Sequence, residues 1–142
     1  MKCPMSFEVF STASPGIQTA FEARAHDLPT IACAIPPEFH GPGNGYSPED
    51  LYTLALITCF IATFKVFAEK SQFSFQSIEA KANLTIDRNE KGMPTLTRID
   101  TEVTLTGVQD QDKARKLCQD AERYCLVSNA IKSEKTYSYM FV

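Results

Sequence analysis

The chain has 142 residues, of which 44% are hydrophobic and 22% are charged. This length and apolar content suit one ordinary domain with a real core, which excludes a disordered tail or a collagen-like rod. Fourteen Lys and Arg residues against seventeen Asp and Glu residues give a net charge of -3. Because the basic excess typical of nucleic-acid binders is missing, we expect no nucleic-acid partner.

The first third of the sequence predicts β-strands. Apolar residues alternate with polar ones over 5–9 and over 17–25, and a short apolar run covers 31–35. Residues 36–46 hold three Pro and three Gly, which neither a helix nor a central strand tolerates. We therefore expect a loop there, with glycines that leave room for close backbone approach.

A long helix is predicted next, from residue 48 to about residue 70. Ser47 stands at the N-cap position, Pro48 at the first helical position, and acidic residues follow in the first turn. Residues 51–64 are apolar nearly all round, so most sides of this helix must be covered. One small sheet covers a single face, which favours a subunit partner. The uncharged run is shorter than the roughly 20 residues of a membrane span, so we expect no membrane partner.

The second half of the chain predicts two further strands, a helix and a closing strand. Alternation over 75–86 and 98–105, with a turn at 89–92, predicts a long antiparallel hairpin. A helical period over 110–124 predicts an amphipathic helix, and residues 136–142 predict the last strand.

This order of elements predicts the α+β fold class, with two helices segregated against mostly antiparallel sheet. The chain shows no internal repeat, no low-complexity tract and no block of like charges. We therefore expect a single domain over residues 1–142.

The five cysteines are the residues most suited to chemistry. Their number is odd, their spacing is wide, and the first residues lack the pattern of a secretory signal. We therefore expect a cytoplasmic protein whose cysteines are free thiols, metal ligands or catalytic groups. No CxxC pair, no HExxH and only two histidines are present, so we expect no metal. The cysteines are Cys3, Cys33, Cys59, Cys118 and Cys125.

A cysteine on an apolar helix face is usually a small buried hydrophobe with a raised pKa and no reactivity. This interpretation is open for Cys59 and for Cys125 when each is taken alone. Cys118 lies on the inward face of the predicted helix 110–124, so we expect it in the core. Cys3 and Cys33 receive no role.

Two segments of the sequence together resemble the OsmC/Ohr family of thiol-dependent organic-hydroperoxide reductases. They are GNGYSPEDLYTLALITCF, which ends just after Cys59, and AERYCLVSNAIK, which contains Cys125. The resemblance implies a fold of mostly antiparallel sheets packed on a long central apolar helix and a second helix, in an intertwined homodimer. It also implies that Cys59 is the peroxidatic nucleophile and Cys125 the resolving cysteine, without a prosthetic group or metal. The implied partners are an organic or fatty-acid hydroperoxide and a dithiol reductant, either a lipoyl group or a small thiol.

The resemblance also suggests residues around the two thiols. Glu49 precedes Cys59 by ten helical residues, roughly 15 Å, so if it belongs to the site it must come from the partner subunit. The alternative for Glu49 is compensation of the helix dipole. Side chains suggested for a substrate pocket are Phe39, His40, Tyr52 and Phe60, although an aromatic stripe more often packs in a core.

The sequence departs from the family pattern at the position of an activating arginine. Peroxidatic members carry this arginine where Gln18 or Phe39 falls here, and many have proline where Leu126 follows Cys125. Without a nearby cation, burial in an apolar helix raises the pKa of a thiol. Two functions therefore stay open, a peroxidase acting through Cys59 and Cys125, and a non-catalytic redox sensor or binder of small hydrophobic molecules. A structural dimer with inert thiols is a third possibility.

Overall fold

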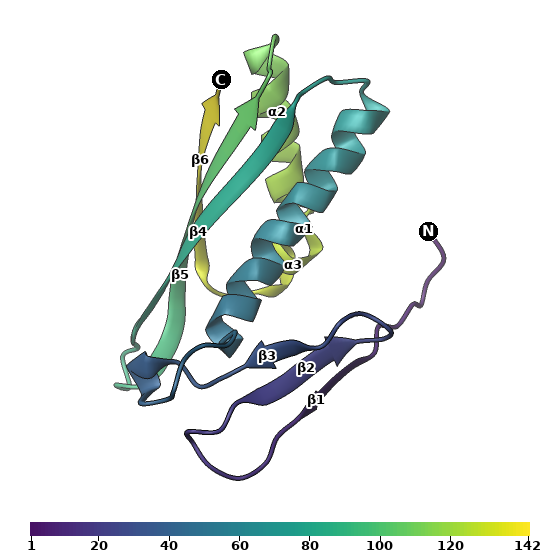
Figure 1. Cartoon of the computed structure of the whole chain (residues 1–142). Helices are drawn as coiled ribbons and strands as arrows, with labels where there is room; N and C mark the ends of the chain where they lie inside the picture. The colour runs from purple at the N-terminus through teal and green to yellow at the C-terminus, as the bar shows by residue number, and fades with distance from the viewer. The chain divides into compact units, whose positions relative to one another are not determined.

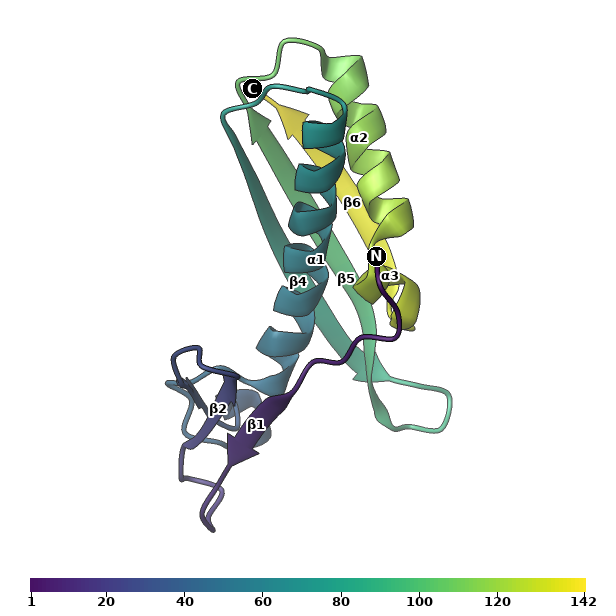
Figure 2. The same cartoon turned by 90° about the vertical axis from the view of Figure 1, so that its right-hand side faces the viewer.

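The computed structural model describes residues 1–142 and contains two compact units, Met1–Leu51 and Tyr52–Val142. Figure 1 and Figure 2 show their helices and strands from two sides. Most contacts fall within one unit or the other. The expectation of a single domain over residues 1–142 stays a prediction.

The first unit holds a three-stranded antiparallel sheet in the order β1–β2–β3. The alternation pattern predicted these strands, but β1 starts later than the predicted residues 5–9. The reason is that Val9 pairs with Ala25 at the end of β2, and the chain turns away at His26, whose φ is 44°. The strands are β1 (Val9–Thr12), β2 (Phe21–Ala25) and β3 (Ile31–Cys33).

The loop after β3 folds back onto that strand. It contains a short 3-10 helix, η1 (Pro37–Phe39), and returns so that the N–H of Tyr46 donates to the carbonyl of Ala32 at 2.9 Å. A Cβ atom on Gly45 would lie only 2.8 Å from the carbonyl carbon of Cys33. The expected close backbone approach is therefore present, and it requires glycine at this position.

Helix α1 (Pro48–Lys70) begins where its N-terminal signals predicted. The Oγ of Ser47 accepts a hydrogen bond from the N–H of Asp50 at 3.0 Å, and the Oδ2 of Asp50 accepts one from the N–H of Ser47, also at 3.0 Å. This reciprocal pair is a capping box, which satisfies N–H groups that the first turn leaves unpaired.

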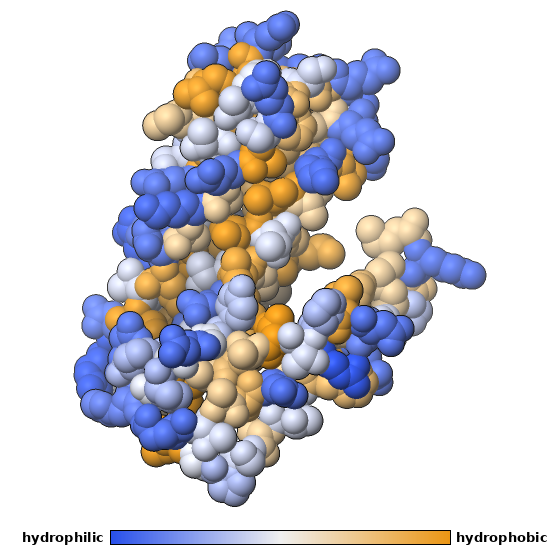
Figure 3. Space-filling model, viewed as in Figure 1, coloured by the Kyte–Doolittle hydropathy of each residue, from blue (hydrophilic) through white to orange (hydrophobic).

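One face of α1 is buried and the opposite face is exposed. Leu56, Phe60 and Phe64 are completely buried, whereas the exposed face carries Leu54 and Val66. Figure 3 shows apolar residues, in orange, along α1. Over its full 23 residues α1 is long and apolar enough to cross a membrane by length and composition alone, a test that core helices also pass.

The second unit is a three-stranded sheet in the order β4–β5–β6, covered on one face by α1 and α2 (Figure 1; Figure 2). β4 and β5 form the predicted antiparallel hairpin, and β6 pairs with β5 in parallel. A short helix, α3, was not predicted. The elements are β4 (Ser77–Arg88), β5 (Pro94–Thr106), α2 (Gln111–Tyr124), α3 (Leu126–Ala130) and β6 (Glu134–Phe141).

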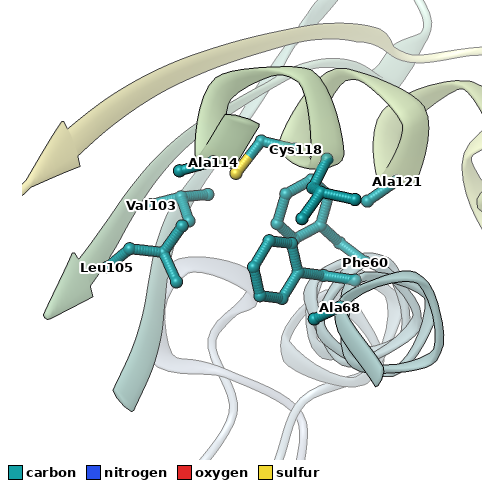
Figure 4. Packing of buried hydrophobic residues seen from close by; sticks show 9 residues of the cluster. Phe60, Ala68, Val103, Leu105, Ala114, Cys118 and Ala121 are labelled. Carbon is teal, nitrogen blue, oxygen red and sulfur yellow. The ribbon is translucent and has the colours of Figure 1, made fainter. Parts of the chain in front are cut away.

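Two hydrophobic clusters fill the space between the helices and this sheet. The Cys118 cluster joins Phe60 and Phe64 of α1 to Cys118 of α2 and Leu105 of β5 (Figure 4). The Cys125 cluster contains the buried residues Leu56, Ile99 and Cys125, with Tyr52, Cys59 and Val127 among the side chains packed against them. The first cluster therefore contains the thiol of Cys118, and the second brings together those of Cys59 and Cys125.

Candidate functional site

Cys59 and Cys125 meet in the Cys125 cluster. Cys59 lies in the middle of α1 and is partly exposed, whereas Cys125 is completely buried between α2 and α3. The two side chains share a hydrogen bond, and both cysteines are free thiols. The structure thus brings the two cysteines of the predicted pair into contact in their reduced state.

A break between two helices places Cys125 at this position. α2 ends at Tyr124, and Cys125 then takes an extended backbone conformation (φ -66°, ψ 115°) before α3 begins at Leu126. The Sγ of Cys125 accepts a hydrogen bond from the N–H of Ser128 at 3.4 Å, and it lies 4.0 Å from the carbonyl oxygen of Leu56. Cys125 therefore caps α3 and ties it to α1.

The pKa of Cys59 lies below the usual value for a cysteine. Burial by itself raises this pKa, but hydrogen bonds from the backbone N–H of Val127, from Cys125, from the backbone N–H of Leu126 and from Thr63 outweigh it. These hydrogen bonds favour the charged form of the thiol. Thiolate stabilisation at Cys59 thus comes mainly from α3 and from the second cysteine.

Cys125 is shifted in the opposite direction. Burial, followed by its hydrogen bond to Cys59, raises its pKa to about 11, although the N–H of Ser128 works against the increase. A thiol that donates to a neighbouring thiolate holds its own proton more tightly. The pair is therefore asymmetric, because the pKa of Cys59 is lowered and that of Cys125 is raised.

The departure at Leu126 has a structural consequence. A proline at this position has no N–H, whereas Leu126 donates its backbone N–H to Cys59. The first N–H groups of a helix have no carbonyl partner within the helix, so they are free to serve the sulfur. The residue that differs from the family pattern thus supplies a hydrogen-bond donor to the candidate nucleophile.

Tyr137 is a titratable neighbour of the two sulfurs that the sequence did not reveal. Its ring stacks on Phe60 with centroids 5.4 Å apart. Burial, together with the charges of Cys125, Glu122 and Cys59, raises its pKa to about 12. The strand predicted over 136–142 includes Tyr137, but no local signal indicates that this residue meets the thiols.

The suggested pocket residues fall in different places. Tyr52 packs in the Cys125 cluster, and its hydroxyl lies 2.7 Å from the Oγ of Ser133. Phe60 is completely buried in the Cys118 cluster, so it acts in packing, and its part in a pocket stays a prediction. Phe39 ends η1 in the first unit, and His40 caps it with a φ of 63°.

The charged and polar residues of the first unit have partners of their own. Gln18 donates from Nε2 to the carbonyl of His40 at 2.7 Å. Arg24 donates to the carbonyl of His26 at 2.6 Å, and its guanidinium lies 4.2 Å from the ring centroid of Phe10. Glu49 lies in the first turn of α1, and its role at the site stays a prediction.

The remaining cysteines are separated from this pair. Cys118 lies in the core, as expected, and burial followed by the nearby charge of Glu122 raises its pKa to about 12. Cys33 is buried in the first unit and Cys3 is exposed. No group of three or more His, Cys, Asp or Glu side chains is arranged to hold a metal ion.

Comparison of the sequence with known proteins finds one family. A sequence model described as OsmC-like protein matches residues 41–139. The chain is 32% identical over 104 residues to the uncharacterized protein YmaD of Bacillus subtilis, covering 70% of this chain and 69% of that protein. It is 28% identical over 97 residues to peroxiredoxin OsmC of Escherichia coli, covering 68% and 67%.

Comparison with solved structures finds the same fold. An OsmC-like protein of unknown function from Vibrio cholerae has a TM-score of 0.84 at 17% identity, covering 96% of this chain and 100% of that one. The organic hydroperoxide resistance protein OhrB of Bacillus subtilis has a TM-score of 0.71 at 16% identity, covering 97% and 98%. At these identities the similarity establishes the fold alone.

Proposed function

The chain belongs to the OsmC-like protein family, and on this premise we propose that it is a cysteine-based peroxidase that reduces organic hydroperoxides to alcohols. The observation that carries the proposal is the asymmetric thiol pair, in which the pKa of Cys59 is lowered and that of Cys125 is raised to about 11. A relative named peroxiredoxin OsmC and a structural neighbour named for organic hydroperoxide resistance support it.

Cys59 performs the first step. Its thiolate attacks the distal oxygen of the hydroperoxide, the O–O bond breaks, and the sulfur supplies two electrons to form a sulfenic acid. The leaving alkoxide takes a proton and departs as the alcohol. Because only the thiolate is nucleophilic, the hydrogen bonds from Val127 and Leu126 increase the reactive fraction of Cys59 at neutral pH.

Cys125 performs the second step. Its sulfur attacks the sulfenic sulfur of Cys59, the S–S bond forms, the S–O bond breaks, and the thiol proton leaves with the hydroxide as water. The contact already present between the two reduced side chains shortens the movement that this step requires. A dithiol reductant, a lipoyl group or a small thiol, then exchanges with the disulfide and restores both thiols.

The proposed enzyme is a cytoplasmic homodimer. The exposed face of α1, which includes Leu54 and Val66, supports a partner because a mostly apolar helix requires cover. Glu49 precedes Cys59 by ten residues of α1, roughly 15 Å of rise. For Glu49 to act near a nucleophile, the partner subunit's Glu49 must therefore serve this subunit's Cys59.

The absence of arginine at Gln18 and Phe39 favours a second candidate function. In that alternative the chain is a redox sensor or a binder of small hydrophobic molecules, and the thiol pair oxidises without efficient turnover. The two candidates differ in rate and in product, because only the peroxidase converts a hydroperoxide to its alcohol repeatedly in the presence of a dithiol.

The deciding experiment follows loss of an organic hydroperoxide and formation of its alcohol with the parent protein, Cys59→Ser and Cys125→Ser. We expect turnover in the parent, none in Cys59→Ser, and a single oxidation with persistent sulfenic acid in Cys125→Ser. Cys3→Ser is the matched control, because Cys3 is exposed and outside the pair. A parent that consumes no more hydroperoxide than Cys59→Ser would defeat the peroxidase proposal.

A further inference from the structure

We propose that Lys135 is a positioning residue for the thiol pair, because its ammonium holds α3 in the place from which the backbone of α3 reaches both sulfurs. The inference rests on the proposed function in taking Cys59 as the reacting thiol. It goes further by naming a charged group that acts on Cys59 through α3 (Leu126–Ala130).

The ammonium of Lys135 bridges two carbonyl groups at the C-terminal end of α3. Its Nζ donates to the carbonyl of Ser128 at 2.8 Å and to that of Ile131 at 3.0 Å. Lys135 itself stands in β6, where it pairs with Ile99 of β5. The side chain therefore ties the end of α3 to the sheet.

α3 depends on such support because it is so short. Its backbone hydrogen bonds include one from the N–H of Asn129 to the carbonyl of Cys125 at 3.1 Å and one from the N–H of Ile131 to the carbonyl of Val127 at 3.2 Å. Helices of this length are unstable on their own in water. A cation that binds the last carbonyls of a helix satisfies groups that the helix leaves unpaired and interacts favourably with the helix dipole.

The same short helix carries the hydrogen-bond donors to both thiols. The backbone N–H groups of Leu126 and Val127 bond to Cys59, and that of Ser128 bonds to Cys125. Movement or fraying of α3 therefore weakens the stabilisation of the Cys59 thiolate and loosens the resolving cysteine together. A contact at one end of α3 thus controls chemistry at the other end.

Other titratable groups lie near the thiol pair, and the Lys135 variants keep all of them. These groups are Tyr52 of α1, Glu122 of α2, Tyr137 of β6 and Cys125. Lys113 offers a matched control elsewhere in the second unit, since its Nζ also donates to a backbone carbonyl, that of Ser71 at 3.0 Å. The contact made by Lys113 lies at the start of α2, away from α3.

The test compares Lys135→Met with Lys113→Met, because methionine keeps the apolar stem and removes the ammonium. The reduced full-length proteins are alkylated with iodoacetamide across pH, and mass spectrometry reads the label at each cysteine. In Lys135→Met we expect the pH midpoint for Cys59 to rise, and its rate at pH 7 to fall roughly tenfold for every pH unit by which the midpoint rises. The limiting rate at high pH should stay near that of the parent, Lys135→Arg should recover most of the loss, and Lys113→Met should match the parent.

Amide hydrogen exchange of residues 126–131 separates positioning from a direct effect of the charge. We expect faster exchange there in Lys135→Met and not in Lys113→Met. An unchanged midpoint for Cys59, an equal change in Lys113→Met, or a higher midpoint with unchanged exchange would each overturn the inference. If Lys135→Met does not fold, Lys135→Gln, which keeps a neutral donor, carries the same comparison. Since no hydroperoxide is used, failure of the peroxidase proposal appears only in the turnover assay.

Discussion

The Cys118 cluster and the Cys125 cluster both lie between α1 and the same sheet, yet their thiols differ in acidity. Burial raises the pKa of Cys118 to about 12, whereas the pKa of Cys59 falls below its usual value although burial raises it too. Cys118 lies within α2, where backbone N–H groups are used by the helix. Cys59 faces the start of α3, where N–H groups are unpaired within the helix. The comparison indicates that hydrogen-bond donors, together with partial exposure, lower the pKa of Cys59 relative to that of Cys118.

The largest expected contrast is between removal of Cys59 and removal of Cys118. Cys59→Ser should reduce hydroperoxide turnover to the background rate, because the nucleophile is lost. Cys118→Ala should keep most of the turnover and lower the free energy of unfolding by roughly 1 kcal/mol, the cost of deleting a buried group of about methyl size. Turnover assays and chemical denaturation measure the two effects, and a Cys118→Ala protein without turnover would break the comparison.

Alkaline pH should destabilise the protein through its buried thiols. The pKa of Cys118 is about 12 in the folded chain and roughly 8.5 in the unfolded chain, so its contribution is complete below the unfolded value and is lost as pH rises towards the folded value. Between these values the unfolded state binds fewer protons, and stability falls by up to about 1.4 kcal/mol per pH unit. Denaturation curves at several pH values should show a shallower fall in Cys118→Ala; an equal slope would contradict the burial of this thiol.

Leu126→Pro removes the backbone N–H of Leu126, one of the hydrogen-bond donors that Cys59 has and Cys118 lacks. Proline lacks the N–H but is tolerated at the first position of a helix, and the ψ of 115° at Cys125 suits a residue before proline. We expect a higher pKa for Cys59 and a loss of about threefold to tenfold in alkylation rate at pH 7, as for a pKa higher by about half to one pH unit. Leu126→Ala keeps the N–H and is the matched control, so a similar loss in both variants would point to the side chain instead.

Thr63→Val should give the smallest change. Thr63 makes the weakest contribution among the four hydrogen-bond partners that lower the pKa of Cys59, because its hydroxyl proton is directed to the carbonyl of Cys59 at 2.8 Å. We expect the alkylation rate of Cys59 at pH 7 to fall by no more than about threefold, as for a pKa higher by roughly half a pH unit. Thr58→Val is the control, because Thr58 makes the same kind of bond to Leu54 on the exposed face. A larger effect than that of Leu126→Pro would reverse the order of the donors.

Much of the fold was predictable from local patterns. The Ser47 and Asp50 signals placed the start of α1, and alternation identified the β4–β5 hairpin. α3 was missed because five residues are too few to show a helical period. The parallel pairing of β6 with β5 was also not predictable, since the direction of a strand depends on the path of the preceding chain.

At the site, the sequence by itself determined that Cys118 faces inward from its helix and that Cys59 lies on an apolar one, because side-chain direction follows from the period of the helix. The resemblance to a family suggested which two cysteines pair. Only the tertiary structure decided that Leu126 and Val127 bring N–H donors to Cys59 and that Lys135 holds α3 from the sheet. These contacts join residues far apart in the chain, and such neighbours depend on how whole elements pack rather than on any local pattern.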